Sequence, residues 1–116
     1  MSNLGFRVFK PDQKPLPILL NISHSGSIFP RSEEHWYLPE IVKAPLETDW
    51  YLDRVYKFGP SIGITTIRAN YSRFLIDLDA NPEIKKIPSE KPQLDICPSQ
   101  TYNGQSIYSK KLINEK

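Results

Sequence analysis

Residues 17–30, Pro-Ile-Leu-Leu-Asn-Ile-Ser-His-Ser-Gly-Ser-Ile-Phe-Pro, constrain the fold of this chain more than any other segment. Residues 18–22 are a short apolar run with one asparagine, and this composition is typical of a buried strand. The run leads into a turn of small residues that carries His24. Open α/β sheets bind ligands beyond the carboxyl ends of their strands. We therefore expect His24 at a functional site, with a hydrogen bond to a loop as the alternative.

The size and composition of the chain predict one small domain. The sequence has 116 residues, eleven prolines and a net charge of +2, which gives no indication of a nucleic acid or an acidic membrane as partner. The single cysteine, Cys97, excludes an internal disulfide and a cysteine-based zinc cluster. We find no membrane-spanning run and no signal-peptide core, so we expect a cytoplasmic protein.

The order of expected elements predicts an α/β fold. The clearest helix is expected at 48–58, with Thr48 as its N-cap and Gly59-Pro60 as its stop signal. A shorter helix capped by Ser32 is expected at 32–36. From residue 80 to residue 116 we expect an extended, proline-rich loop region rather than regular structure. The expected strands are 6–9 at an edge, 18–22, 61–68, and 73–78 at the centre of the sheet.

Two acidic residues stand on one side of the predicted helix 48–58. Asp49 and Asp53 are four residues apart, so both project from the same helix face. Two such carboxylates repel one another unless a nearby cation neutralises their charge. One interpretation is metal or substrate contact near the helix N-terminus, and the other is an exposed acidic edge.

Asp77 is the unexpected residue of the predicted strand 73–78, because it puts a carboxylate into an almost continuously apolar run. A buried carboxylate must be hydrogen-bonded or paired, and Arg68 and Arg73 are its nearest candidate partners. The first interpretation is a structural ion pair. The second is that one arginine holds a substrate carboxylate, because the planar guanidinium binds a carboxylate through two hydrogen bonds.

Four segments in order resemble one family, the N-formylglutamate amidohydrolases, which are zinc-dependent hydrolases of histidine catabolism. The match covers nearly the whole chain from about residue 15 and is similar to the N-terminal part of the family. The segments are 18–30 with Ser-His-Ser-Gly, 47–56 (Glu-Thr-Asp-Trp-Tyr-Leu-Asp-Arg-Val-Tyr), 68–78 (Arg-Ala-Asn-Tyr-Ser-Arg-Phe-Leu-Ile-Asp-Leu) and 97–108 (Cys-Pro-Ser-Gln-Thr-Tyr-Asn-Gly-Gln-Ser-Ile-Tyr).

The resemblance implies a fold and an activity. The fold would be a mixed sheet with helices on both faces, similar to the phosphorylase/hydrolase fold of zinc carboxypeptidases and aspartoacylases. This chain would hold the N-terminal portion of that fold as a single domain, 1–116. The activity would be zinc-assisted hydrolysis of a small-molecule substrate, N-formyl-L-glutamate, to formate and glutamate.

The resemblance also implies roles for individual residues. His24 resembles the first zinc ligand, and Asp49 is the best candidate for a carboxylate ligand, with Glu47 as a rival. Asp53 is a further rival and the candidate for the catalytic carboxylate that moves protons. Arg68 and Arg73 resemble residues that face the substrate pocket.

Three departures from the family pattern modify this expectation. Ser27 stands where a His-x-x-Glu pair would place its glutamate, Asp79-Ala80 replaces Asn-Arg, and no histidine follows His35. A catalytic zinc normally has three protein ligands. We therefore expect weak zinc binding and little deformylase activity from this chain alone.

Two alternatives complete the sequence-based predictions. The second hypothesis is a non-catalytic remnant that serves as a binding or interaction module. The third and weaker hypothesis is a serine or cysteine hydrolase that uses Ser25 or Cys97. Whether the chain is a zinc hydrolase or a binding module, an uncovered sheet edge would favour its self-association.

Overall fold

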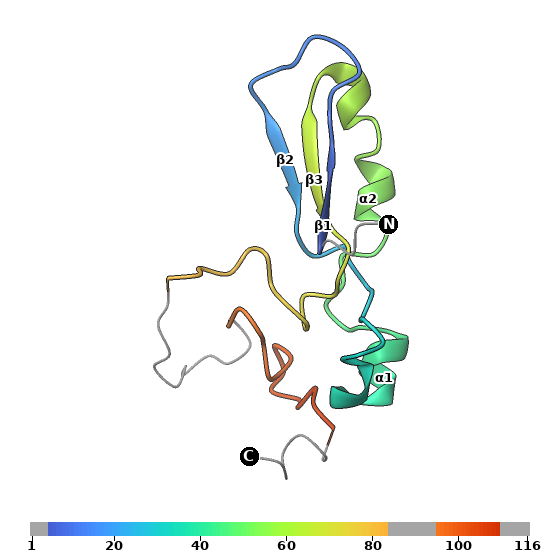
Figure 1. The fold of residues 1–116 in the computed structure, drawn as a ribbon, viewed down its shortest axis with the longest axis vertical. Coiled ribbons are helices and arrows are strands. Elements are labelled where there is room, and N and C mark those ends of the chain that lie inside the picture. Colours follow the sequence, from blue (N-terminus) through green and yellow to red (C-terminus); the bar gives the residue numbers. More distant parts are fainter. Residues whose placement is uncertain (1–4, 84–94, 110–116) are drawn as a thin grey trace.

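Strand β3 (Thr65–Ala69) is the centre of a three-stranded mixed sheet in the computed structural model, which describes residues 5–83 and 95–109. Strand β1 (Phe6–Phe9) pairs with β3 in antiparallel orientation, and β2 (Leu19–Ile22) pairs with it in parallel (Figure 1). The β-branched run at the start of β3 favours this extended backbone. The predicted edge strand 6–9 is confirmed, and the predicted strand 61–68 begins later than expected.

The other two strand predictions need correction. Leu19 in β2 is 65% exposed and Ile22 is the one fully buried residue of the strand, so β2 is an edge strand rather than a buried one. Residues 73–78 form no strand. The N–H groups of Leu75 and Ile76 donate to the Ser72 carbonyl, which folds this segment into turns directly after β3.

The predicted helix 48–58 is shortened at both ends in the structure. Helix α2 spans Leu52–Val55, because the left-handed backbone of Tyr51 (φ 63°) prevents an earlier start. Thr48 does not cap it, since its hydroxyl donates to the Pro45 carbonyl. Gly59 does not end a helix but begins the 3₁₀ helix η2 (Gly59–Ile62).

Two short helices lie in the connection between β2 and α2. Helix η1 (Glu34–Trp36) lies inside the predicted range 32–36, but Ser32 does not cap it. Helix α1 (Pro39–Lys43) was not expected, because prolines punctuate this region. Pro39 is nevertheless compatible with the first helical turn, where its missing N–H leaves no hydrogen bond unmade.

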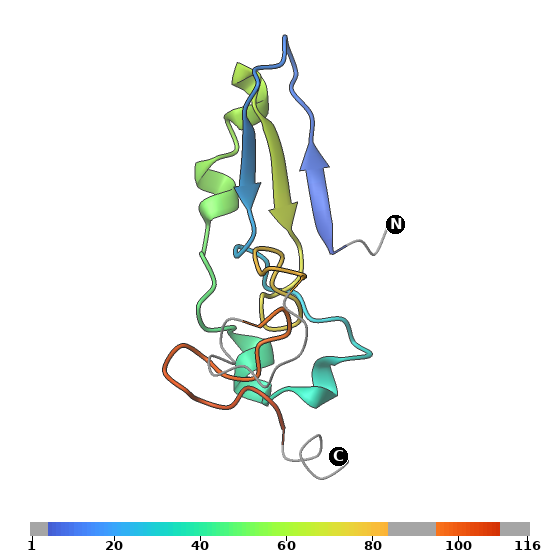
Figure 2. The same ribbon diagram turned by 90° about the vertical axis from the view of Figure 1, so that its left-hand side faces the viewer.

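Helix α2 lies over one face of the sheet (Figure 2). That face carries Phe9, Ile22 and Thr66, which line a pocket together with residues of α2. On the other face, Val8 is 46% exposed, and no helix of the described residues covers it. The prediction of helices on both faces is therefore not met within this part of the chain, and self-association through the sheet edge stays a prediction.

The hydrophobic core lies beyond the strand ends, around α1, rather than between the sheet and α2. There the Tyr37 hydroxyl donates to the Phe74 carbonyl, and the Phe29 and Tyr37 rings pack with centroids 4.7 Å apart. Figure 1 shows the segment near residue 100 beside α1, which is how Ile107 enters this core. The buried cluster consists of Phe29, Tyr37, Ile41, Phe74 and Ile107.

The predicted loop region 80–116 is described only in part. Residues 84–94 and 110–116 lie outside the described residues. Within 95–109 the regular pairing consists of single bridges, Gln100 with Ser106 and Tyr108 with Tyr37. Among the helices that the structure describes, none has the length and apolar character needed to cross a bilayer.

The core assignment predicts a large difference between two phenylalanines. Phe74 is fully buried, whereas Phe58 is 51% exposed. We expect Phe74→Ala to lower the free energy of unfolding by about 3–5 kcal/mol, because it removes a buried ring and leaves a cavity. Phe58→Ala is the matched control and should lower the free energy of unfolding by well under half as much. Urea unfolding followed by circular dichroism measures both, and equal losses would contradict the position of the core.

Candidate functional site

The loop that carries His24 is held against the segment that follows β3. A Cβ atom on Gly26 would lie 2.2 Å from the Tyr71 carbonyl oxygen, so this position needs a glycine. The Ile28 N–H donates to the Asn70 carbonyl, and the Ser72 N–H donates to the Ile28 carbonyl. His24 therefore lies where the carboxyl ends of the parallel strands β2 and β3 meet, as the sequence predicted.

His24 is bound to Asp77. Its Nε2 atom lies 2.7 Å from Asp77 Oδ1, and the two side chains are 22% and 6% exposed. Burial of the carboxyl group would raise its pKa, but hydrogen bonds from His24, the Asp79 N–H and Arg73 outweigh burial and hold the pKa of Asp77 below its usual value. An ionised Asp77 can accept a hydrogen bond from Nε2, and the tautomer of His24 that donates from Nε2 has its lone pair on Nδ1.

Arg73 continues this set of contacts on the other side of Asp77. Its Nε donates to Asp77 Oδ2 at 3.1 Å, and its Nη1 donates to Glu47 Oε2 at 2.6 Å. The arginine side chain is 2% exposed. Glu47 in turn accepts the backbone N–H of Tyr102. We call His24, Asp77, Arg73 and Glu47 the buried ion network.

Asp49 reaches the same region through its backbone. The Asp49 N–H donates to the His24 carbonyl at 2.8 Å, while the Asp49 side chain is exposed. Glu47 and Tyr51, on either side, have positive φ angles of 59° and 63°. Left-handed backbone at non-glycine residues is costly and is found often at functional sites. The segment 47–51 is thus held in a strained form beside His24.

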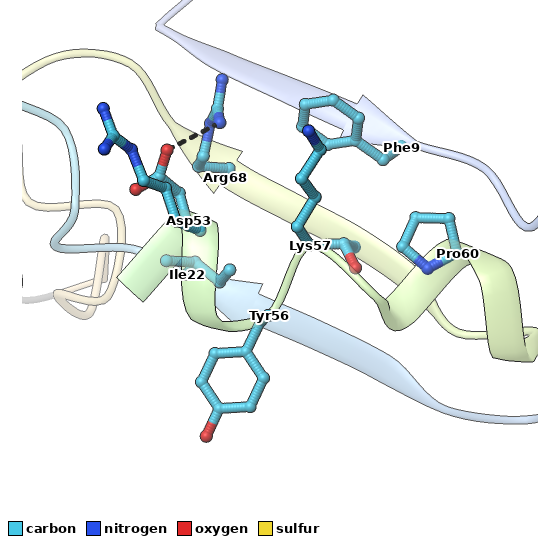
Figure 3. Close-up of a pocket in the computed structure, with 9 residues that line it drawn as sticks. Phe9, Ile22, Asp53, Tyr56, Lys57, Pro60 and Arg68 are labelled. Atoms are coloured by element: carbon cyan, nitrogen blue, oxygen red, sulfur yellow. Dashed lines mark hydrogen bonds and ion pairs between the residues drawn. The ribbon is translucent and has the colours of Figure 1, made fainter. Parts of the chain in front are cut away.

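Asp53 and Arg68 form a second, more open ion pair. Arg68 Nη1 lies 3.1 Å from Asp53 Oδ2, with the side chains 27% and 32% exposed (Figure 3). The Arg68 guanidinium also lies 5.0 Å from the centroid of the Phe9 ring. Arg68 is therefore not the partner of Asp77, whereas the prediction that Arg73 pairs with Asp77 agrees with the geometry.

The described residues fit a metal ion in part. His24 and Asp49 are joined through their backbones and offer one nitrogen and one carboxylate. Across residues 5–83 and 95–109, however, no three His, Cys, Asp or Glu side chains are grouped so that they could hold a metal ion. Of the rival carboxylates, Glu47 binds Arg73 and Asp53 binds Arg68. His35 stacks on Trp36 with centroids 4.3 Å apart, as expected for a packing histidine.

A serine or cysteine nucleophile receives no support from the geometry. Ser25 Oγ is buried and makes no hydrogen bond to His24 or to any other described group. Burial, and then the charge of Asp95, raise the pKa of the Cys97 thiol, so its nucleophilic thiolate form is disfavoured.

Sequence reasoning missed the contact between His24 and Asp77, which lie 53 residues apart. The sequence did show that Asp77, a carboxylate in an apolar run, needs a partner. It did not identify His24 as that partner. Glu47 was considered as a metal ligand, whereas the structure places its carboxylate on Arg73.

Comparisons with known proteins agree on one family. The family model of N-formylglutamate amidohydrolase matches residues 16–116. The chain is 27% identical over 93 residues to an N-formylglutamate deformylase of Pseudomonas aeruginosa, covering 80% of this chain and 34% of that protein. It is 26% identical over 106 residues to one of Pseudomonas putida, covering 91% of this chain and 39% of that protein. The chain thus spans less than half the length of these curated relatives.

A solved structure shares the fold. The crystal structure of an N-formylglutamate amidohydrolase from Ralstonia eutropha JMP134 matches with a TM-score of 0.68 and 21% identity. The match covers 96% of this chain and 45% of that one. At this identity the likeness shows the fold alone.

The two arginines of the site should differ sharply in their contribution to stability. Arg73→Gln leaves two carboxylates, Asp77 and Glu47, without their shared cation in a buried position, and we expect a loss of about 3–5 kcal/mol. Arg68→Gln breaks the more exposed pair with Asp53 and should cost about 0–1 kcal/mol. Chemical unfolding of both variants measures the difference. If both lose the same amount, the buried ion network is not what joins these segments.

Proposed function

The chain belongs to the N-formylglutamate amidohydrolase family, and from this membership we propose that it carries part of the active site of an N-formyl-amino-acid hydrolase. By analogy with the names of the relatives, the proposed substrate is N-formyl-L-glutamate. The observation that carries the proposal is the position of His24, at the carboxyl ends of parallel strands and held by a buried carboxylate. The proposed location is the cytoplasm, as the single cysteine suggests.

We propose zinc as the cofactor, with His24 and Asp49 as its ligands from this chain. A bound zinc ion polarises a carbonyl group and lowers the pKa of a bound water. Asp77 supports the role of His24, because a carboxylate that accepts from one ring nitrogen fixes the tautomer and orientation of the other. Further ligands would come from outside the described residues.

The remaining roles fall to the second ion pair and the buried ion network. In the hydrolysis, water adds to the formyl carbon, the C–N bond breaks, and the nitrogen gains a proton. Asp53 is the proposed carboxylate that takes the proton from water and returns it to the leaving nitrogen. Arg68, the more accessible arginine, is the proposed contact for a substrate carboxylate. Arg73 is already bound by two carboxylates and keeps Asp77 in place.

A binding or interaction module is the second candidate function. It is favoured by Arg73, whose guanidinium is bound by Asp77 and Glu47, and by Asp79-Ala80, where the family resemblance leads us to expect Asn-Arg. The two candidates differ in whether His24 still binds metal, so metal binding is the measurement that separates them.

The metal proposal predicts zinc binding that depends on two residues. By isothermal titration calorimetry we expect one weakly bound zinc per chain, with binding lost in His24→Ala and reduced about tenfold or more in Asp49→Asn. His35→Ala is the control and should bind zinc like the unmodified chain, because His35 packs on Trp36 elsewhere. Binding that is unchanged in His24→Ala would exclude the metal site and favour the binding module.

Turnover is expected to be absent or close to background. With zinc present, this chain should release little formate from N-formyl-L-glutamate, because its described residues offer two donors where catalytic zinc sites commonly use three. A coupled formate assay measures this directly. Clear turnover that disappears in His24→Ala would contradict the expectation that part of the site lies outside these residues.

A further inference from the structure

Two arginines lie directly opposite each other on the sheet. In the antiparallel pairing of β1 with β3, Arg7 is the partner of Arg68. Such partners have Cβ atoms about 5 Å apart on the same sheet face, and two like charges in these positions destabilise the pair. The guanidinium carbons of both arginines lie 5.0 Å from the centroid of the Phe9 ring, so the two cations share one aromatic neighbour. An anion that contacts both side chains would offset their repulsion.

The positive charge of this arginine pair is only partly neutralised. Asp53 forms an ion pair with Arg68, whereas Arg7 is exposed and forms no ion pair within residues 5–83 and 95–109. The contact with Asp53 uses one nitrogen of Arg68, and a guanidinium group has further N–H donors on its other nitrogens. Both arginines therefore have donors left for a further anion.

The arginine pair lies at the same edge of the sheet as His24. Ile22, the last residue of β2, is opposite Arg68 in the parallel pairing, and His24 follows Ile22 by two residues. Because β3 lies between β1 and β2, residues Arg7, Arg68 and Ile22 form one row across the sheet. Neighbouring strands are about 4.8 Å apart, so Arg7 is one strand farther from the His24 loop than Arg68.

Other cations of the described chain are less suited to bind an anion at this edge. Arg73 is 2% exposed and already binds two carboxylates. The Arg54 guanidinium carbon lies 5.1 Å from the centroid of the Tyr51 ring. Lys57 is two residues before η2, which lies near the start of β3 rather than its end (Figure 1). Arg7 therefore offers the exposed cation closest in the strand pairing to Arg68.

The proposed substrate has two carboxylates, and each needs a cation. In N-formyl-L-glutamate the α-carboxylate is next to the reacting amide, and the γ-carboxylate ends the side chain. Arg68 suits the α-carboxylate, because its partner Asp53 is the proposed carrier of protons to and from that amide. Arg7 suits the γ-carboxylate, because it lies one strand farther from His24.

We propose that Arg7 is a specificity-determining residue of the hydrolase site and contacts the γ-carboxylate of the substrate, while Arg68 contacts the α-carboxylate. This inference rests on the proposed function, from which it takes the substrate. It adds that the site selects N-formyl amino acids with an acidic side chain over those with a neutral one. The bound γ-carboxylate also offsets the repulsion between the two arginines.

The test compares two ligands of the same shape. N-formyl-L-glutamine has an amide in place of the γ-carboxylate of N-formyl-L-glutamate. In NMR titrations of the full chain with zinc present, we expect the unmodified chain to bind N-formyl-L-glutamate about tenfold more tightly, and Arg7→Gln to bind both ligands equally. Arg7→Lys should keep part of the preference, because it keeps the charge without the planar fork of donors. Arg31→Gln, at an exposed arginine before η1, is the control and should keep the whole preference.

Thermal unfolding separates this role from a structural one. Arg7→Gln removes one of two opposed like charges, so its unfolding midpoint should be unchanged or higher. A lower midpoint with equal weakening of both ligands would show a structural role of Arg7 and overturn the inference. It would also be overturned if Arg7→Gln kept the preference, or if the unmodified chain bound both ligands equally or neither. None of these results removes the proposed function, whose own failure is zinc binding that does not depend on His24.

Discussion

The structure depends on one buried guanidinium bound by two carboxylates. Arg73 holds Asp77 on one side and Glu47 on the other, and through them it joins the turn after β3, the strained segment before α2 and the loop near Tyr102. Burial of these charges is tolerable because each has a hydrogen-bonded partner. His24 gains its fixed ring from this arrangement, since its own partner, Asp77, is held by Arg73.

This arrangement explains which parts of the fold the sequence could predict. Strand β1 follows from local alternation, and its predicted bounds agree with the structure. The apolar composition of segment 73–78 predicts a central strand. In the structure, Arg73 pairs with Asp77 across one turn, and the Ser72 carbonyl accepts backbone N–H groups of that turn. Local hydrophobicity favours a strand there, whereas the pairing of two charged side chains four residues apart favours a turn.

The sequence predicted the features of the candidate site that follow from the order of elements along the chain. It did not predict the contacts between residues far apart in the sequence. The position of His24 follows from an apolar strand that ends in a turn of small residues. Its contact with Asp77 spans 53 residues, and composition or periodicity carries no information about such a pair. Helix 48–58 was predicted from its caps and spacing, but the left-handed backbone at Tyr51 delays the start of α2 to Leu52.

The ion pair of Asp53 with Arg68 connects the site to the pocket beneath α2. Arg68 extends from β3, whose neighbouring residue pairs place Ile22 opposite Arg68 and Thr66 opposite Phe9 on one sheet face. From α2 and the residues directly after it, Asp53, Arg54, Tyr56 and Lys57 line the pocket, so charged side chains and one ring border the hollow above this face. A hollow of this kind loses the packing energy that a closed helix–sheet contact would supply.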